Sequence, residues 1–90
     1  MITEIYVVTV EMPEVPSYRK QKGFTTAENA KAYVIEFLKT ELPYFDSCEI
    51  DELISDLSKS YAKNSKAFRV EWLDTVLNEN SISVVAVEVE

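Results

Sequence analysis

Hydrophobic and polar residues alternate with a period of two near both ends of the chain, which is the spacing of a strand with two different faces. This alternation, together with many Val, Ile, Thr and aromatic residues, predicts strands over residues 2–12, 66–77 and 81–89. Residues 78–80, Asn-Glu-Asn, predict the turn of a hairpin between the last two strands. Residues 18–24, YRKQKGF, fit a short further strand that follows two prolines.

The middle of the chain has the three-to-four-residue spacing of helices instead. It predicts one helix from about Ala27 to Glu41 and a second that starts after Asp46 and ends near Lys63. Thr25 with Glu28, and Asp46 with Glu49, fit capping boxes at the two starts. The expected buried stripes are Ala27, Ala30, Val34, Phe37 and Leu38 in the first helix and Ile50, Leu53, Ile54, Leu57 and Tyr61 in the second.

The order of these elements is strand, short strand, helix, helix, strand, strand, which is typical of the α+β class. Ninety residues with no linker and no internal repeat predict a single domain, residues 1–90. We predict an antiparallel or mixed sheet of three or four strands with both helices packed on one face.

The opposite face of this sheet is expected to keep apolar side chains, because the first and last strands have apolar residues on both faces. An uncovered apolar face usually marks an interface, so we predict a self-association or docking surface there. The alternative is that residues 12–24 fold over this face. The residues of the predicted self-association surface are Ile5, Val7, Val85 and Val87.

Missing residue types argue against many catalytic mechanisms. The chain has no histidine, which excludes Ser–His and Cys–His pairs and zinc held by histidine. It has one glycine, Gly23, which excludes a phosphate-binding glycine-rich loop. We therefore expect a protein that is not an enzyme and binds no cofactor. A small enzyme or ligand-binding domain that depends on carboxylates is the remaining alternative.

The charge of the chain favours protein partners over nucleic acids. Sixteen acids against nine bases give a net charge of −7, which argues against binding to nucleic acid or to anionic lipid and favours a basic partner. Arg19, Lys20 and Lys22 form one basic island, which fits an edge strand that resists pairing; phosphate binding is its alternative.

A cytoplasmic location is expected from the cysteine content and from the start of the sequence. The single cysteine, Cys48, excludes a disulfide framework and suits a reducing compartment. The first residues lack the pattern of a signal peptide, and no apolar run is long enough to cross a membrane. The neighbouring acids oppose formation of a thiolate, so we predict that Cys48 is inert and partly buried.

The most distinctive polar segment is FDSCEIDELISDL, residues 45–57, with five carboxylates and no positive charge. Acids early in a helix and bases late stabilise it through the macrodipole, so a solvated helix face explains much of this pattern. Carboxylates beside aromatic residues also fit a binding site for a basic protein. The spacing does not fit an EF-hand, so no metal is predicted. The predicted partner-binding residues are Glu41, Tyr44, Phe45, Asp46, Glu49, Asp51, Glu52 and Asp56.

In size, acidity and lack of catalytic residues, the chain resembles the small inhibitors that phages and other mobile elements carry, such as anti-CRISPR proteins and DNA-mimic proteins. The resemblance implies a protein that blocks a nucleic-acid-binding enzyme by placing carboxylates where phosphates would lie. The alternative is an assembly module that forms a homodimer through the apolar sheet face. In either case we expect no direct contact with nucleic acid or with a membrane.

Overall fold

The structure is a computed structural model of the chain, and it describes residues 3–12, 18–42, 45–73 and 78–89. The α+β class and the predicted order of elements are confirmed, and they include the short strand at residues 18–24. The elements are β1 (Thr3–Met12), β2 (Tyr18–Phe24), α1 (Ala27–Thr40), α2 (Ser47–Lys63), β3 (Ala67–Leu73) and β4 (Glu79–Val89).

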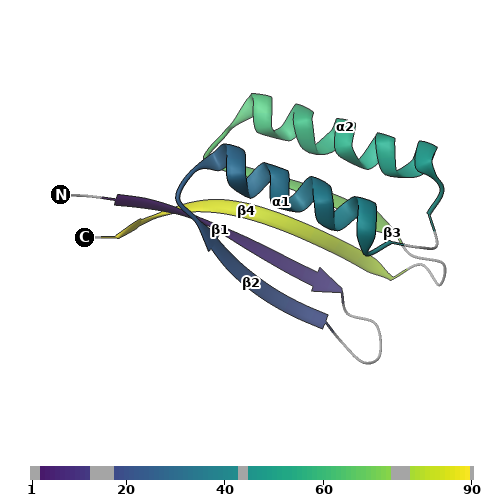
Figure 1. The fold of residues 1–90 in the computed structure, drawn as a ribbon, viewed down its shortest axis with the longest axis horizontal. Coiled ribbons are helices and arrows are strands. Elements are labelled where there is room, and N and C mark those ends of the chain that lie inside the picture. Colours follow the sequence, from purple (N-terminus) through teal and green to yellow (C-terminus); the bar gives the residue numbers. More distant parts are fainter. Residues whose placement is uncertain (1–2, 13–17, 43–44, 74–77, 90) are drawn as a thin grey trace.

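The strands form one antiparallel sheet in the order β2-β1-β4-β3, and both helices cover the same face of it (Figure 1). The first and last strands are therefore neighbours in the centre of the sheet, where Thr3 pairs with Val89. Helix α2 packs on β3, whereas α1 packs on the other three strands. Because β2 extends the sheet sideways, residues 18–24 do not fold over its uncovered face, and residues 13–17 lie outside the described part.

The alternation in the sequence decides which side chains meet the helices. In β3, Phe68, Val70 and Trp72 are buried while the residues between them are exposed. In the helices, all five predicted positions of α1 are buried, and so are Ile50, Leu53 and Leu57 of α2; Ile54 and Tyr61 are half-buried against the core. The rest of the core from the sheet consists of Val8, Val10, Ile82 and Val84.

Helix α2 has the predicted cap, Asp46, although the bond from Asp46 N–H to the Glu49 side chain that would complete a capping box is not among those of the described residues. The Oδ1 atom of Asp46 accepts a hydrogen bond from the backbone N–H of Glu49, with an N···O distance of 2.8 Å. This bond satisfies a backbone donor that has no partner within the helix, and the aspartate also places negative charge at the positive end of the dipole.

Helix α1 starts at Ala27 as predicted, but its cap lies one residue later than expected. Thr26, not Thr25, is the capping residue, and its Oγ1 accepts from the backbone N–H of Asn29 at 3.1 Å. The reason is that Ala27 is the first helical residue, so only the hydroxyl immediately before it reaches the third helical N–H. Glu28 does not complete a capping box; its Oε1 accepts instead from the hydroxyl of Tyr61, at 3.3 Å.

The predicted turn at residues 78–80 is also corrected. Strand β4 begins at Glu79, and Asn80 pairs with Trp72 in the ladder. Asn80 is only 2% exposed, and its side-chain N–H donates to the backbone oxygen of Asn78 at 3.2 Å. This local bond allows a buried amide to take a strand position that its residue type disfavours. The predicted end of the preceding strand, residues 74–77, lies outside the described residues.

Both edges of the sheet carry features that oppose pairing with another strand. In β2, Arg19, Lys20 and Lys22 are exposed, as expected for an edge strand. In β3, the backbone N–H of Arg69 donates to Oγ of Ser60 in α2, at 3.1 Å, so a helix occupies part of that edge. Both edges therefore resist the addition of another strand.

Candidate functional site

The uncovered side of the sheet carries a strip of apolar side chains that we call the open-face strip: Ile5, Val7, Val85, Val87 and Val89. The last three are 48%, 44% and 43% exposed, and the first two are half-buried. Ile5 pairs with Val87 and Val7 pairs with Val85 across β1 and β4, so the strip runs along the centre of the sheet. The four residues predicted for self-association thus lie together on one surface.

Small residues flank this strip on both sides. Gly23 of β2 pairs with Val7, and Ala67 of β3 pairs with Val85. A Cβ atom at Gly23 would lie 3.1 Å from Cγ2 of Ile5, so the glycine makes room for the isoleucine beside β2. On the other flank, a hollow is lined by residues of β3 and β4: Ala67, Phe68, Arg69, Ser83, Val84 and Val85. Val7 and Val85 therefore stand between two small residues, whereas Ile5, Val87 and Val89 lie beyond the ends of β2 and β3.

Toward the other end of the strands, the open face carries polar residues. Gln21 Nε2 donates to Thr9 Oγ1 at 3.2 Å. Beyond them, Arg19 Nε lies 3.7 Å from Glu11 Oε1, and Arg69 Nη2 lies 3.1 Å from Glu71 Oε1. These ion pairs are exposed, so each adds little stability to the fold. The face changes along its length from apolar to hydroxyl and amide groups, and then to charges of both signs, with Leu73 of β3 exposed at the far end.

The predicted acidic surface lies in a different layer of the molecule. Glu49, Glu52 and Asp56 are exposed on α2, which covers the opposite side of the sheet (Figure 1). Among the described residues, no ion pair involves an acid of the segment 41–56. The other predicted acids, Glu41, Asp46 and Asp51, are exposed as well. All six predicted acids are therefore exposed, and they lie on or beside the helices, away from the open face.

The two aromatic residues predicted beside these acids have different outcomes. Phe45 is half-buried and packs against the core, and its backbone N–H donates to the carbonyl of Leu42 at 3.2 Å. Its ring therefore contributes to the packing of the corner between the helices. Tyr44 lies outside the described residues.

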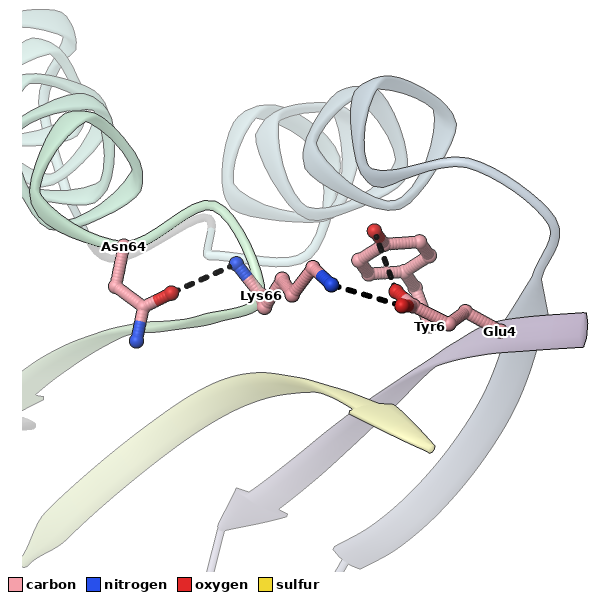
Figure 2. A network of polar contacts seen from close by, with 4 residues as sticks. All are labelled: Glu4, Tyr6, Asn64 and Lys66. Carbon is pink, nitrogen blue, oxygen red and sulfur yellow. Dashed lines mark hydrogen bonds and ion pairs between the residues drawn. The ribbon is translucent and has the colours of Figure 1, made fainter. Parts of the chain in front are cut away.

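A polar network that the sequence did not indicate joins β1 to the connection between α2 and β3. Figure 2 shows Lys66 with its Nζ 2.8 Å from Glu4 Oε1, and the hydroxyl of Tyr6 donating to Glu4 Oε2 at 3.3 Å. The backbone N–H of Lys66 donates to Oδ1 of Asn64 at 3.0 Å. Glu4 pairs across the sheet with Glu88, so the lysine also offsets repulsion between two carboxylates.

The electrostatics of this network point to a structural role. The hydrogen bond from Lys66 lowers the pKa of Glu4, and the same bond raises the pKa of Lys66. Burial, and then the charge of Glu4, raise the pKa of Tyr6. Each shift moves the pKa of its group further from neutral pH, so none of these groups exchanges a proton at neutral pH. Glu4 and Lys66 are 62 positions apart in the chain, which is why no local pattern revealed them.

Cys48 is exposed, which corrects the prediction that it is partly buried. It lies in the first turn of α2, away from the stripe of Ile50, Leu53 and Leu57 that faces the core. Within the described ranges, no group of three His, Cys, Asp or Glu side chains is placed to hold a metal ion. The same residues include no helix long and apolar enough to cross a membrane.

Comparisons with protein-family models, with curated proteins and with solved structures find no match to this chain.

Proposed function

We propose that this protein is not an enzyme but a binding protein, and that it contacts another protein chain through the open-face strip. The observation that carries the proposal is the row of three valines, each more than 40% exposed, in the centre of a sheet. Apolar side chains that are grouped in this way are uncommon on a surface unless a partner covers them. Both sheet edges oppose pairing, which leaves this face as the surface suited to association.

The chemistry of the chain supports a binding role. It has no histidine, and the groups with shifted pKa values in the network around Glu4 move away from neutral pH. The open face itself carries hydroxyl, amide and paired charged groups beside the apolar strip, which resembles the apolar centre and polar rim of a protein interface. A cytoplasmic location, where the thiol of Cys48 stays reduced, fits this role.

Capture from native extract tests the proposed contact surface. Tagged wild-type protein is expected to retain one dominant protein chain at low and at high salt, because apolar contacts are not screened. Val87→Glu is expected to lose this chain, since a carboxylate would be buried against the partner. Ala32→Glu adds the same charge at an exposed position of α1 and should retain it. Equal capture by the wild type and Val87→Glu would exclude the open-face strip as the contact surface.

A second candidate function is inhibition of a nucleic-acid-binding enzyme, of the kind found among phage and mobile-element inhibitors. The observation that favours it is the exposed acids of α2, which have no cationic partner among the described residues. Carboxylates on a helix can occupy a groove built for phosphates, and charge complementarity speeds association. In this version the partner has a basic surface and binds the helix layer.

Charge reversal tests the second candidate. The triple variant Glu49→Lys, Glu52→Lys and Asp56→Lys is expected to abolish binding of a basic partner, in an interaction that also weakens as salt rises. A matched control reverses three exposed acids that lie neither on the outer side of α2 nor on the open face, Glu28, Glu36 and Glu88, so the net charge changes equally. If both triple variants weaken capture to the same extent, net charge is responsible and the α2 surface is not the site.

A further inference from the structure

We propose that the partner on the open face is a second copy of this chain, packed face to face about a two-fold axis. The axis lies in the interface and runs along the strands, between β1 and β4. This inference rests on the proposed function, since it names the protein chain that the open-face strip contacts. Three features of the described residues favour a second copy: the charge of the face, the chemistry of its rows and its size.

The open face is nearly neutral on a strongly acidic molecule. Its described charged residues are two arginines and three glutamates, whereas the whole chain has a net charge of −7. The remaining excess of acid lies elsewhere, including the outer side of α2. Two acidic copies that meet through their open faces therefore keep most of their negative charge apart. A strongly basic partner would instead find little to attract it there. The charged residues of the face are Glu11, Arg19, Arg69, Glu71 and Glu79.

The proposed axis places apolar residues of one copy against apolar residues of the other copy. Rotation about it places β1 opposite β4 of the second copy, and β2 opposite β3, because the sheet order is β2-β1-β4-β3. At the level where Val7 pairs with Val85, each of these valines then meets the other residue in the second copy. On both sides of these valines, Gly23 faces Ala67 of the second copy, so small residues also meet small residues across the interface.

The charged row matches in the same way. Arg19 and Glu71 lie at one level of the sheet, because Glu11 pairs with both Arg19 and Ser81, and Ser81 pairs with Glu71. The two-fold axis places Arg19 of β2 opposite Glu71 of β3 in the second copy. By symmetry, Arg19 of the second copy lies opposite Glu71 of the first. Arg19 of each copy then has Glu71 across the interface in addition to Glu11 within its own chain.

The size of the face approaches what a specific dimer needs, since the smaller specific interfaces bury about 600 Å² on each partner. Strands about 4.8 Å apart, with about 3.4 Å per residue, give the described sheet roughly 550 Å² in projection, and its accessible surface is larger. A standard interface buries about 800 Å² on each partner. Sheets that pack face to face lie about 10 Å apart with their strands inclined by about 30°, so the central rows form the closest contacts.

Sedimentation over a range of concentrations tests whether the second copy binds. The wild type is expected to be a dimer that persists in about 1 M salt, since the centre of the contact is apolar. Val85→Glu is expected to weaken dimerisation by at least about 100-fold, because two carboxylates enter each interface. Ala32→Glu should leave the dimer intact. Circular dichroism of Val85→Glu should match that of the wild type, which separates loss of the dimer from loss of the fold.

Charge exchange tests the direction of the axis. Arg19→Glu and Glu71→Arg are each expected to weaken the dimer about 10-fold at low salt, because each places two like-charged pairs across the interface. The double variant should recover most of the wild-type affinity, although each exchanged side chain then lies beside a like charge in its own chain. A double variant as weak as the product of the two single effects would overturn the proposed axis.

A failure of this inference can be told from a failure of the proposed function. A wild type that stays monomeric at millimolar concentration, yet captures a different protein that Val87→Glu loses, overturns the second copy and leaves the open face as a binding surface. A monomer that captures no protein through this face overturns both.

Discussion

Replacing Val84 by glutamate is expected to unfold the protein, whereas the same replacement at Val85, the next residue, leaves it folded. Val84 is fully buried between the sheet and the helices, and Val85 is 48% exposed on the open face. A carboxylate at position 84 loses its hydration and finds no charged partner among the buried residues. This costs several kcal/mol, of the order of 4 or more, besides the lost packing of the valine.

This loss is a large part of the total stability of the domain. A chain of 90 residues is stabilised by about 5–13 kcal/mol, so Val84→Glu removes much or all of it. Far-UV circular dichroism and urea unfolding measure both variants. Val85→Glu should keep a cooperative transition, with a modest shift at concentrations where the wild type is dimeric. Similar unfolding curves for the two variants would mean that Val84 does not face the core while Val85 faces the solvent.

The opposite roles of these neighbours could be predicted from sequence because they follow from a local period. The same holds for the buried stripes of both helices and for the Asp46 cap, since each depends on residues within one or two turns. The errors are also local in origin. Two threonines stand side by side before α1, and only the conformation of the backbone decides that Thr26 is the cap. An asparagine suggested a turn at position 80, but its buried amide has local bonding that the sequence pattern does not reveal.

The arrangement of the sheet could not be predicted in the same way. Its two central strands pair Thr3 with Val89, which lie at opposite ends of the chain. No local signal encodes a contact between residues so far apart in the sequence. The Glu4–Lys66 network depends on this arrangement, because the lysine meets the glutamate only after the strands are ordered. The exposure of Cys48, in contrast, follows from the helical period, because this residue lies away from the stripe of Ile50, Leu53 and Leu57.

For the candidate sites too, some features follow from the local sequence and others only from contacts between residues far apart in the chain. The open-face residues could be listed from sequence because alternation assigns them to one face, but their grouping into one strip requires the β1–β4 pairing. The acids of α2 were visible as a run of charge, and the structure places them in the helix layer, across the sheet from the strip. The two proposals are therefore compatible in space. A face-to-face dimer leaves both α2 surfaces outward, which would present two acidic faces to a basic partner and raise its apparent affinity through multivalency.

The contact between α2 and the edge strand β3 has the second large expected effect. Phe68 is 2% exposed and lies edge-to-face against Tyr61 of α2, with 5.1 Å between the ring centroids. Phe68→Ala removes a whole aromatic side chain from this contact, so we expect the free energy of unfolding to fall by about 3–5 kcal/mol. Leu73→Ala is the matched control in the same strand, since Leu73 is 52% exposed and should cost under about 1 kcal/mol.

Chemical denaturation of both variants measures the difference, and Phe68→Leu distinguishes its causes. Leucine restores part of the buried volume without the aromatic pair, so its stability should lie between that of the wild type and that of alanine. Because α2 also binds the edge of β3 through Ser60 and Arg69, Phe68→Ala is expected to loosen this helix first. Hydrogen exchange should then increase in α2 more than in α1, which packs on the other three strands. Equal increases in both helices would show that the helices open as one unit, with Phe68 supporting the whole core.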